Sequence, residues 1–293
     1  MKVIIFGSRG LLGHALLEAF HGEILAAYDR EQVDVADKTA VARIIAASRT
    51  EVVINAAAYN AVDAAEIDAA AARQAMRVNA EAVSGLAQAC AASKATFVHI
   101  STDYVFDGEK GAPYVEDDEP NPLSVYGRSK AQGERFICEL GASGLKYYLI
   151  RTSRLFGPQS ASEGSKPTFI EVVLEAAASG RQMRFIDGEE IASPTYVNDL
   201  AVAIRRLIDD RQPYGIYHRT NDGAASWYEF ARAILEESGV KGAALKPIRS
   251  ADLERPARRP RYSVLRSTKL PALRPWRDAL RAYLKTTYHS SEV

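Results

Sequence analysis

A tyrosine and a lysine stand four residues apart, at Tyr126 and Lys130, in a stretch whose pattern predicts a helix over residues 123–140. Side chains at this spacing lie one above the other on the same helix face. A phenol has a pKa near ~10, and an adjacent ammonium group favours its ionised form and lowers that pKa. We therefore predict that Tyr126 donates a proton, and that the Thr102 hydroxyl, from a predicted strand end, orients the same substrate oxygen. Without a supporting context, such a pair is more often a plain surface feature.

The N-terminus supplies such a context, because a short apolar strand over residues 2–6 leads through a glycine-rich turn into a helical pattern. Glycines allow the backbone to turn tightly and to approach a diphosphate, and a helix N-terminus presents free amides and a partial positive charge. The spacing GxxGxxG differs by one residue from the GxGxxG fingerprint of dinucleotide-binding proteins. We predict cofactor contacts from the whole turn, which consists of Gly7, Ser8, Arg9, Gly10, Leu11, Leu12 and Gly13.

The second predicted strand ends in Asp29 and Arg30, where this kind of fold places the residues that contact the adenosine ribose. A guanidinium group matches the geometry of a phosphate, so Arg30 and Arg9 are candidates to bind a 2′-phosphate. Asp29 is equally suited to a free ribose. The sequence thus favours NADPH as the cofactor, with NADH as the alternative, and we expect Asp34 and Val35 to border the adenine.

Two further predicted strands end beside the same crevice. The third closes with the small side chains of Ala56, Ala57 and Ala58, which leave room for a cofactor, and the fourth carries Thr102. Strands that alternate with helices indicate a parallel sheet, in which ligands bind beyond the carboxyl ends of the strands. We therefore predict an α/β protein with a Rossmann-like doubly wound parallel sheet and a smaller C-terminal α/β lobe for substrate.

The predicted domains follow from this order. Residues 1–153 form the NAD(P)-binding Rossmann domain, to which segments within about 168–217 partly return, and residues 154–293 mainly form the substrate-binding lobe. A single Ala-rich helix, with a break near its start, is expected over residues 67–93.

The composition favours a small-molecule partner. Of 293 residues, 37 are Lys or Arg and 37 are Asp or Glu, so no net field attracts nucleic acid or an acidic membrane surface. No segment has the pattern of a signal peptide or a membrane helix, and we expect a cytoplasmic protein. The two cysteines and five histidines lack metal-ligand spacing, so we expect packing roles for Cys90 and Cys138, a core position for His99, and no metal site.

Five short segments, distributed over both predicted domains, resemble those of one enzyme family. They read NAAAYNAVDAAE at residues 55–66, STDYVFDG at 101–108, PLSVYGRSKAQGE at 122–134, SPTYVNDL at 193–200 and RRPRYSVL at 258–265. With the glycine turn, they resemble the dTDP-4-dehydrorhamnose reductases, which are extended short-chain dehydrogenases/reductases. The resemblance implies reduction of the C4 ketone of a dTDP-4-keto-6-deoxyhexose by NADPH or NADH, converting dTDP-4-dehydro-β-L-rhamnose to dTDP-L-rhamnose. It is compatible with a homodimer.

The resemblance also implies roles for single residues. Tyr126 would protonate the carbonyl oxygen as hydride arrives from the nicotinamide, Lys130 would lower the pKa of Tyr126 and hold the nicotinamide ribose, and Thr102 would bind the sugar oxygen. Asn79 matches a residue that supports a proton-relay water, and is counted with the catalytic set. Arg259 lies in an arginine-rich segment that suits either a second diphosphate or a solvated surface. The predicted substrate contacts are Thr102, Asp103, Tyr104, Arg154 and Arg259.

Two positions depart from the family pattern. The family usually has a tryptophan that packs against the sugar after the Thr-Ser of the fifth strand, whereas this chain has Arg154. A guanidinium there would pair with hydroxyls or phosphate, which puts the identity of the sugar in question. Some members bridge a dimer through magnesium with a carboxylate of the first helix, where this chain has Ala15, so no metal is carried over.

Two other functions fit the same scaffold. One is a different nucleotide-sugar enzyme: another ketoreductase, an epimerase or a 4,6-dehydratase. Dehydratases carry an extra acid where this chain has Tyr104, which favours simple reduction. The other is a non-catalytic NADP-binding subunit, like the regulatory subunit of methionine adenosyltransferase, against which the intact Thr102, Tyr126 and Lys130 argue.

Overall fold

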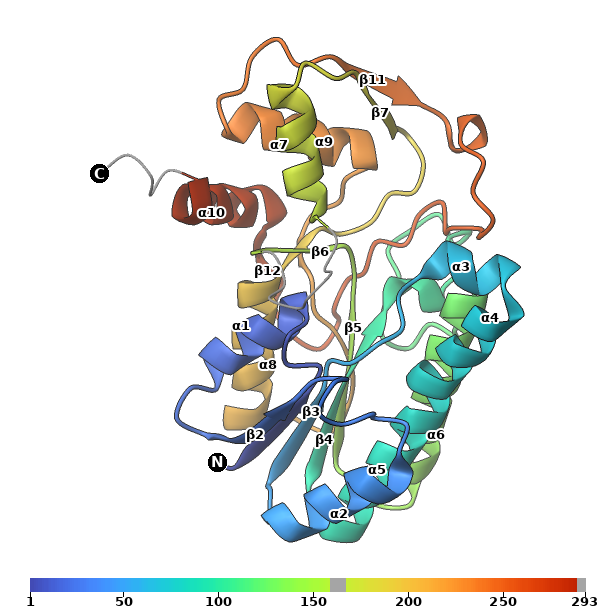
Figure 1. Ribbon diagram of the computed structural model, residues 1–293, viewed down its shortest axis with the longest axis vertical. Helices are drawn as coiled ribbons and strands as arrows, with labels where there is room; N and C mark the ends of the chain where they lie inside the picture. The colour runs from blue at the N-terminus through green and yellow to red at the C-terminus, as the bar shows by residue number, and fades with distance from the viewer. Residues whose placement is uncertain (159–166, 289–293) are drawn as a thin grey trace.

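The centre of the molecule is a parallel sheet of six strands in the order β2-β1-β3-β4-β5-β9. The computed structural model describes residues 1–158 and 167–288 (Figure 1). The chain order reverses between β1 and β3, which is where doubly wound sheets open a ligand-binding crevice at the carboxyl ends of their strands. The strands are β1 (Val3–Phe6), β2 (Ile24–Tyr28), β3 (Val52–Asn55), β4 (Thr96–Thr102), β5 (Tyr147–Thr152) and β9 (Gly215–His218).

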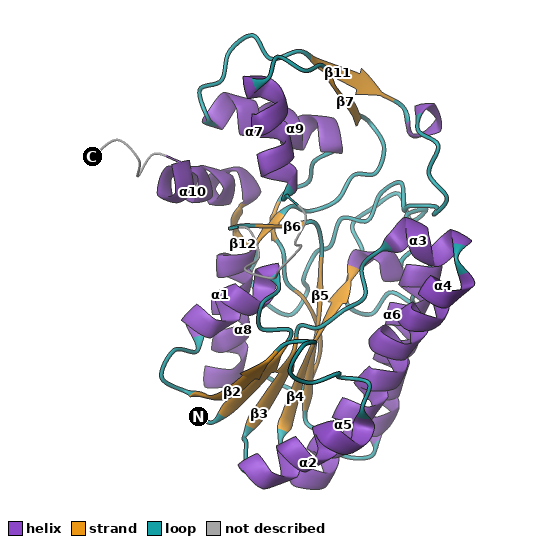
Figure 2. Ribbon diagram, in the orientation of Figure 1, coloured by secondary structure: helices purple, strands orange, loops and turns teal. Residues whose placement is uncertain are grey.

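Helices cover both faces of this sheet (Figure 2). The helices α1 (Leu11–Ala19) and α8 (Val197–Asp209) cover one face, and α2 (Lys38–Ser48), α5 (Ala82–Ser93) and α6 (Val125–Ala142) cover the other. Successive strand side chains point to opposite faces, so Val3 and Ile5 pack with α1 and α8 while Ile4 and Phe6 pack with α2 and α5. Burial on both faces explains why the strands are continuous apolar runs. The predicted doubly wound α/β fold is confirmed.

The segment between β3 and β4 differs from the single helix expected over residues 67–93. It consists of α3 (Val62–Ile67), α4 (Ala69–Met76), a π-helix (Arg77–Glu81) and α5. The chain bends at Asp68, whose carboxylate accepts a hydrogen bond of 2.9 Å from the Ala70 amide and so caps α4. A π-helical turn is rare and often marks a functional position, and here it contains Asn79.

The C-terminal lobe lies beyond the carboxyl ends of the sheet (Figure 1). In it, α7 and β7 pack against α9 and β11, whereas α8 packs against α1 and β9 completes the central sheet. The later elements are β6 (Leu155–Phe156), α7 (Phe169–Ala178), β7 (Met183–Ile186), β8 (Thr195–Tyr196), β10 (Asn221–Asp222), α9 (Trp227–Glu237), β11 (Leu245–Ile248), β12 (Leu273–Pro275) and α10 (Trp276–Tyr288), with 3₁₀ turns at Asp103–Val105 and Ser250–Asp252.

A buried ion pair fixes α6 over the sheet. Arg151 of β5 is only 2 % exposed, and its guanidinium lies 2.8 Å from the carboxylate of Glu134 in α6. The same carboxylate accepts a hydrogen bond from the Ser101 hydroxyl of β4. Loss of one partner from such a pair typically costs about 3–5 kcal/mol of folding free energy, because it leaves a buried charge unpaired. This pair therefore holds the helix that carries Tyr126 beside the strand that carries Thr102.

The remaining sequence predictions concern single side chains and whole-chain properties. Cys90 is buried beneath the sheet, and His99 is buried with its Nδ1 3.1 Å from Asn55 Nδ2, so both core positions are confirmed. Cys138 is a half-buried free thiol.

Within residues 1–158 and 167–288, no helix is long and apolar enough to cross a membrane. The same residues contain no group of three or more His, Cys, Asp or Glu side chains that could hold a metal ion.

Candidate active site

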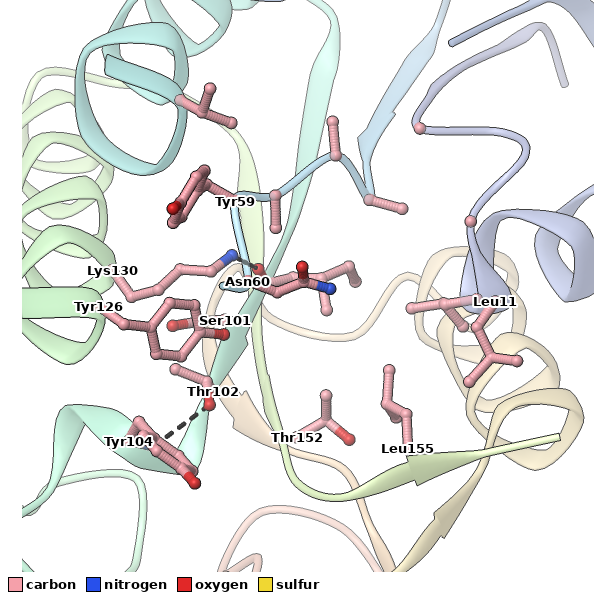
Figure 3. Close-up of a pocket in the computed structure, with 18 of the residues that line it drawn as sticks. Leu11, Tyr59, Asn60, Ser101, Thr102, Tyr104, Tyr126, Lys130, Thr152 and Leu155 are labelled. Carbon is pink, nitrogen blue, oxygen red and sulfur yellow. Dashed lines mark hydrogen bonds between the residues drawn. The ribbon is translucent and has the colours of Figure 1, made fainter. Parts of the chain in front are cut away.

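A cavity of about 960 Å³ opens at the carboxyl ends of the strands (Figure 3). Most of the predicted site residues line it, although they come from distant parts of the chain. Three of the predicted site residues, all within the described part of the chain, do not line it: Ser8, Arg9 and Asn79. The predicted residues that line it are Gly7, Gly10, Leu11, Leu12, Gly13, Asp29, Arg30, Asp34, Val35, Ala56, Ala57, Ala58, Thr102, Asp103, Tyr104, Tyr126, Lys130, Arg154 and Arg259.

The glycine turn forms one end of the cavity, and its backbone is too closely packed to accept side chains. Gly7 has a φ of +80°, and a Cβ there would lie 2.5 Å from the Ala57 amide nitrogen. A Cβ on Gly13 would lie 2.0 Å from the Gly7 carbonyl oxygen. The helix α1 starts after Gly10 with no side-chain cap, so its first amides are not satisfied by a capping side chain. These features fit the diphosphate of a dinucleotide.

The adenosine end differs from the prediction in its arginines. The guanidinium of Arg9 forms an ion pair with Glu31, and the Arg9 amide donates to Asp29 at 3.1 Å. Arg30 is exposed and lines the cavity, and its amide also donates to the Asp29 carboxylate, at 2.7 Å. In the structure the Arg9 guanidinium is engaged by Glu31, and the contact of Arg9 and Arg30 with a 2′-phosphate stays a prediction. Nearby, Asp34 lines the cavity and pairs with Arg77.

The proposed catalytic side chains lie together where β4 meets α6. Figure 3 shows Tyr126 and Lys130 projecting from α6 toward the end of β4. The Lys130 ammonium donates a hydrogen bond of 2.8 Å to the Ile100 carbonyl oxygen. The Thr102 hydroxyl lies within hydrogen-bonding reach of the Tyr126 phenol, donates to Asp103 Oδ1 at 3.1 Å and accepts from the Tyr104 amide at 3.2 Å. The structure thus brings together the three groups that the sequence pattern connected.

The pKa of Tyr126 moves in the direction opposite to the prediction. Burial raises the pKa of the phenol, and this effect outweighs the hydrogen bond with Thr102, which lowers it. Burial also lowers the pKa of Lys130 to about 8, although the Glu134 carboxylate opposes that shift. The prediction that Lys130 lowers the pKa of Tyr126 is therefore wrong for this structure, because desolvation dominates. Tyr126 keeps its proton at neutral pH, as a proton donor must.

Asn79 has a structural role that the sequence did not predict. Its side-chain oxygen accepts from the Tyr59 amide at 2.9 Å, while its nitrogen donates to the Tyr59 carbonyl at 2.9 Å and to Ser129 Oγ at 3.0 Å. The Ser129 hydroxyl in turn donates to the Tyr126 carbonyl at 2.7 Å. Asn79 therefore links the Tyr59 segment of the cavity wall to the backbone of Tyr126. A role in proton relay stays a prediction.

Arg259 connects the C-terminal segment to the helix α3 at the edge of the cavity. Its guanidinium forms two hydrogen bonds to the Asp63 carboxylate, at 3.1 and 2.7 Å. The Ala257 amide donates to the same carboxylate at 3.2 Å. Hydrogen bonding to Arg259 is the largest influence on the Asp63 carboxyl and holds its pKa below the ordinary value. Arg259 thus forms an ion pair that joins the C-terminal segment to α3. The sequence had suggested either a contact with a second diphosphate or a solvated surface for this arginine-rich segment.

Arg154, another residue of the cavity wall, is held by two backbone carbonyls and an aromatic ring. Its Nη1 donates to the Ala225 carbonyl and its Nη2 to the Glu190 carbonyl, both at 2.6 Å. The guanidinium carbon lies 4.0 Å from the centroid of the Trp227 ring, a cation–π contact. Burial lowers the pKa of Arg154 to about 10, so the side chain is still charged at neutral pH.

Several wall residues were not singled out from the sequence. Tyr59, Asn60 and Pro260 lie within the family-like segments, so the resemblance contained a signal for them. Glu190 and Trp227 carried no local signal, because only the folding of the C-terminal lobe brings them to the cavity. The full set is Glu31, Val33, Tyr59, Asn60, Val62, Gln74, Arg77, Val78, Ile100, Ser101, Thr152, Ser153, Leu155, Glu190, Ala192, Trp227, Pro260 and Ser263.

Comparison with known proteins identifies the family. The RmlD substrate binding domain family matches residues 1–289. The dTDP-4-dehydrorhamnose reductase of Streptomyces griseus is 37% identical over 289 residues, which cover 94% of this chain and 91% of that protein. A probable dTDP-4,6-dihydroxy-2-methyloxan-3-one 4-ketoreductase of Streptomyces antibioticus is 36% identical over 289 residues, covering 96% and 94%.

A solved structure supports the same assignment. The dTDP-4-dehydrorhamnose reductase of Bacillus anthracis in complex with NADP superposes with a TM-score of 0.89 at 32% identity, covering 98% of this chain and 100% of that one. The resemblance seen in the sequence is confirmed over almost the whole chain. With its glycine cradle, its Thr102, Tyr126 and Lys130 cluster and this full-length similarity, the chain belongs to the RmlD family of dTDP-4-dehydrorhamnose reductases.

Proposed function

We propose that the protein reduces the C4 ketone of a dTDP-linked 4-keto-6-deoxyhexose, converting dTDP-4-dehydro-β-L-rhamnose to dTDP-L-rhamnose with NADPH or NADH. The main support is that Thr102, Tyr126 and Lys130 line the same cavity as the glycine turn over residues 7–13, which suits a dinucleotide. A simple binding protein would not need a buried proton donor at that place. The named activities of the relatives in Streptomyces and the NADP complex in Bacillus anthracis support the same reaction and cofactor class.

The residues that would hold the cofactor are those whose shape leaves room for it. The turn from Gly7 to Gly13 and the N-terminus of α1 suit the diphosphate, and the small side chains of Ala56 and Ala57 leave space beside it. Asp29, Arg30 and Lys130 line the same cavity. Asp29 and Arg30 would border the adenosine, and Lys130 would hold the nicotinamide ribose. The cofactor supplies the hydride when bound.

The protein's own contribution to the chemistry is proton donation and charge stabilisation. As the ketone is reduced, negative charge develops on its oxygen, and a donor placed at that oxygen lowers the barrier. The Tyr126 phenol, protonated at neutral pH, would give up its proton to this oxygen. Thr102 would bind the same oxygen by turning its hydroxyl proton from Asp103 Oδ1 to the ketone, while the Tyr104 amide keeps the hydroxyl oxygen in place.

Turnover of a defined substrate tests the proposal. The 4-ketosugar is prepared from its dTDP-4-keto-6-deoxyglucose precursor with a 3,5-epimerase, and NADPH oxidation is followed by absorbance. We expect oxidation in step with formation of dTDP-L-rhamnose, and less without the epimerase. Tight NADPH binding without turnover of any nucleotide-linked ketosugar would replace the reductase with a non-catalytic NADP-binding subunit.

A further inference from the structure

Two cavity residues have a backbone conformation that side chains rarely adopt. Arg154 has a φ of +43° and Glu190 a φ of +52°. Among the described residues, the other non-glycine positions with positive φ are Arg49, Lys94 and Arg211, and each of these ends a helix, where this conformation is common. Arg154 and Glu190 end no helix. Backbone strain of this kind tends to persist at ligand sites, where the surrounding structure enforces it.

The two strained residues are joined to each other and to Trp227. The Arg154 guanidinium donates to the Glu190 carbonyl, and its other terminal nitrogen donates to the carbonyl of Ala225, two residues before Trp227. The Trp227 indole also contacts Phe169, at a ring distance of 4.7 Å. The Glu190 carboxylate is held separately, by Arg255 and the Ser250 hydroxyl. The guanidinium plane is therefore fixed in one orientation before any ligand arrives.

This fixed cation lies close to the proposed reacting groups. Asp103 and Tyr104, which orient Thr102, are among the charged and polar groups that act on Arg154, together with Glu190 and Glu229. A guanidinium has five N–H donors, and the two carbonyls engage only two of them. Arg154 thus presents a preorganised charged donor at the wall of the sugar-binding region.

Two relatives with similar identity to this chain, 37% and 36%, are named for different ketosugars, a 4-dehydrorhamnose and a 4,6-dihydroxy-2-methyloxan-3-one. Both sugars carry a hydroxyl on a carbon next to the ketone carbon, and they differ elsewhere in the ring. Overall identity therefore does not define the sugar, and individual wall residues must. Building on the proposed reductase function, we propose that Arg154 is a specificity-determining residue. Its guanidinium, positioned by Trp227 and the Glu190 carbonyl, donates a hydrogen bond to a sugar hydroxyl next to the ketone carbon, so the site selects nucleotide-linked ketosugars that carry a hydroxyl there.

The test measures binding, without turnover, in the presence of NADPH. The probes are dTDP-L-rhamnose and dTDP-3-deoxy-L-rhamnose, which lacks the hydroxyl at C3, the carbon next to C4. A third ligand, dTDP-L-mannose, adds a hydroxyl at C6 and serves as a control, because C6 is not bonded to C4. Isothermal titration gives their dissociation constants for wild type and Arg154→Met. We expect the C3 hydroxyl to tighten wild-type binding about tenfold or more, as for hydrogen bonds to charged groups, and to have no effect in Arg154→Met. Trp227→Leu should reduce the same preference, because the Trp227 ring lies under the Arg154 guanidinium and positions it.

A matched control lies far from the cavity. Arg205 also donates to a carbonyl, that of Ala19, and lies over an aromatic ring, that of Phe20, but it is outside the cavity wall. Arg205→Met should leave the preference for the C3 hydroxyl as in wild type. The proposal is overturned if this preference agrees within twofold between wild type and Arg154→Met. The protein could also show this hydroxyl preference, lose it in Arg154→Met, and yet not reduce the ketosugar. That result would reject the proposed reaction but keep the role of Arg154 in binding.

Discussion

The two ends of the cavity are built in different ways. The cofactor end consists mainly of backbone and small side chains, such as Gly7, Gly13 and Ala57, that follow β1 and β3. The end at which we propose that the sugar binds consists of long charged side chains that are held by distant partners. Arg154 bonds to a carbonyl 71 positions away, and Arg259 to a carboxylate 196 positions away.

This difference indicates how each end performs its task. A backbone cradle recognises what all dinucleotides share, so close packing and a helix N-terminus suffice. Discrimination among sugars requires groups that can be exchanged one at a time without disturbing the sheet, and side chains from the C-terminal lobe meet that need. Substitutions at the two ends should therefore separate cofactor binding from sugar binding.

The largest effect is expected at the cofactor end, from Gly13→Ala. The new Cβ would lie 2.0 Å from the Gly7 carbonyl oxygen, so the glycine turn must move. We expect NADPH affinity to fall by about a hundredfold or more. Fluorescence titration measures this, and Gly10→Ala should have a smaller effect because its Cβ would lie 3.3 Å from the same oxygen. An NADPH affinity of Gly13→Ala equal to that of wild type would show that the turn does not contact the cofactor.

Acid should affect the long-range contacts of the C-terminal segment. Glu116 is buried, and hydrogen bonds from Ser267, Thr268 and the His218 amide outweigh the opposing effect of burial and lower its pKa to about 2. A lowered carboxyl pKa stabilises the fold above the ordinary value near 4.5, and this stabilisation is lost as pH falls from there toward 2. This stabilisation is on the order of a few kcal/mol at neutral pH, since one pKa unit corresponds to about 1.4 kcal/mol.

The variant Glu116→Gln tests this link between charge and stability. It should unfold more readily in urea at pH 7 and should show a flatter dependence of the unfolding free energy on pH between 5 and about 2 than wild type. Parallel curves for the two proteins would mean that the Glu116 carboxylate is not the source of the acid sensitivity.

A smaller effect, confined to sugar binding, is expected from Asp63→Asn. The change removes the charge that pairs with Arg259, so the C-terminal segment is held less firmly at the cavity edge. We expect the KM for the ketosugar to change by about tenfold, in line with one partly buried charged hydrogen-bond pair, with an unchanged NADPH dissociation constant. If cofactor binding weakens to the same extent, the two ends of the cavity are not independent.

The smallest effect concerns the choice between NADPH and NADH. Glu31→Gln removes the negative charge that pairs with Arg9, so a 2′-phosphate no longer competes with a carboxylate for that guanidinium. We expect a several-fold gain in the preference for NADPH over NADH, and a several-fold loss in Arg30→Ala. Dissociation constants of both cofactors provide the comparison. Unchanged ratios in both variants would place the 2′-phosphate away from these side chains.

Local spacing in the sequence was enough to predict the sheet, the glycine cradle and the Thr102, Tyr126 and Lys130 cluster. Each depends on neighbours within a few residues, or on strand ends that a parallel sheet brings together. The pKa of Tyr126 was mispredicted because burial is a property of the whole fold. Nothing in the sequence indicated the ion pair between Arg9 and Glu31 or the contact between Arg154 and Glu190. The partners lie 22 and 36 positions apart, and no periodicity in the sequence connects them.

We propose that Tyr126 donates the proton in the ketone reduction, and this role can be tested directly. Tyr126→Phe removes only the hydroxyl and keeps the ring, which packs edge-on against Tyr104. Tyr217→Phe is the control, since it removes a hydroxyl that bonds to the Pro213 carbonyl outside the cavity. We predict that kcat of Tyr126→Phe with the dTDP-4-ketosugar falls by about 10²–10⁴-fold while NADPH affinity barely changes, and that Tyr217→Phe retains its rate. A Tyr126→Phe enzyme as fast as wild type would contradict the claim.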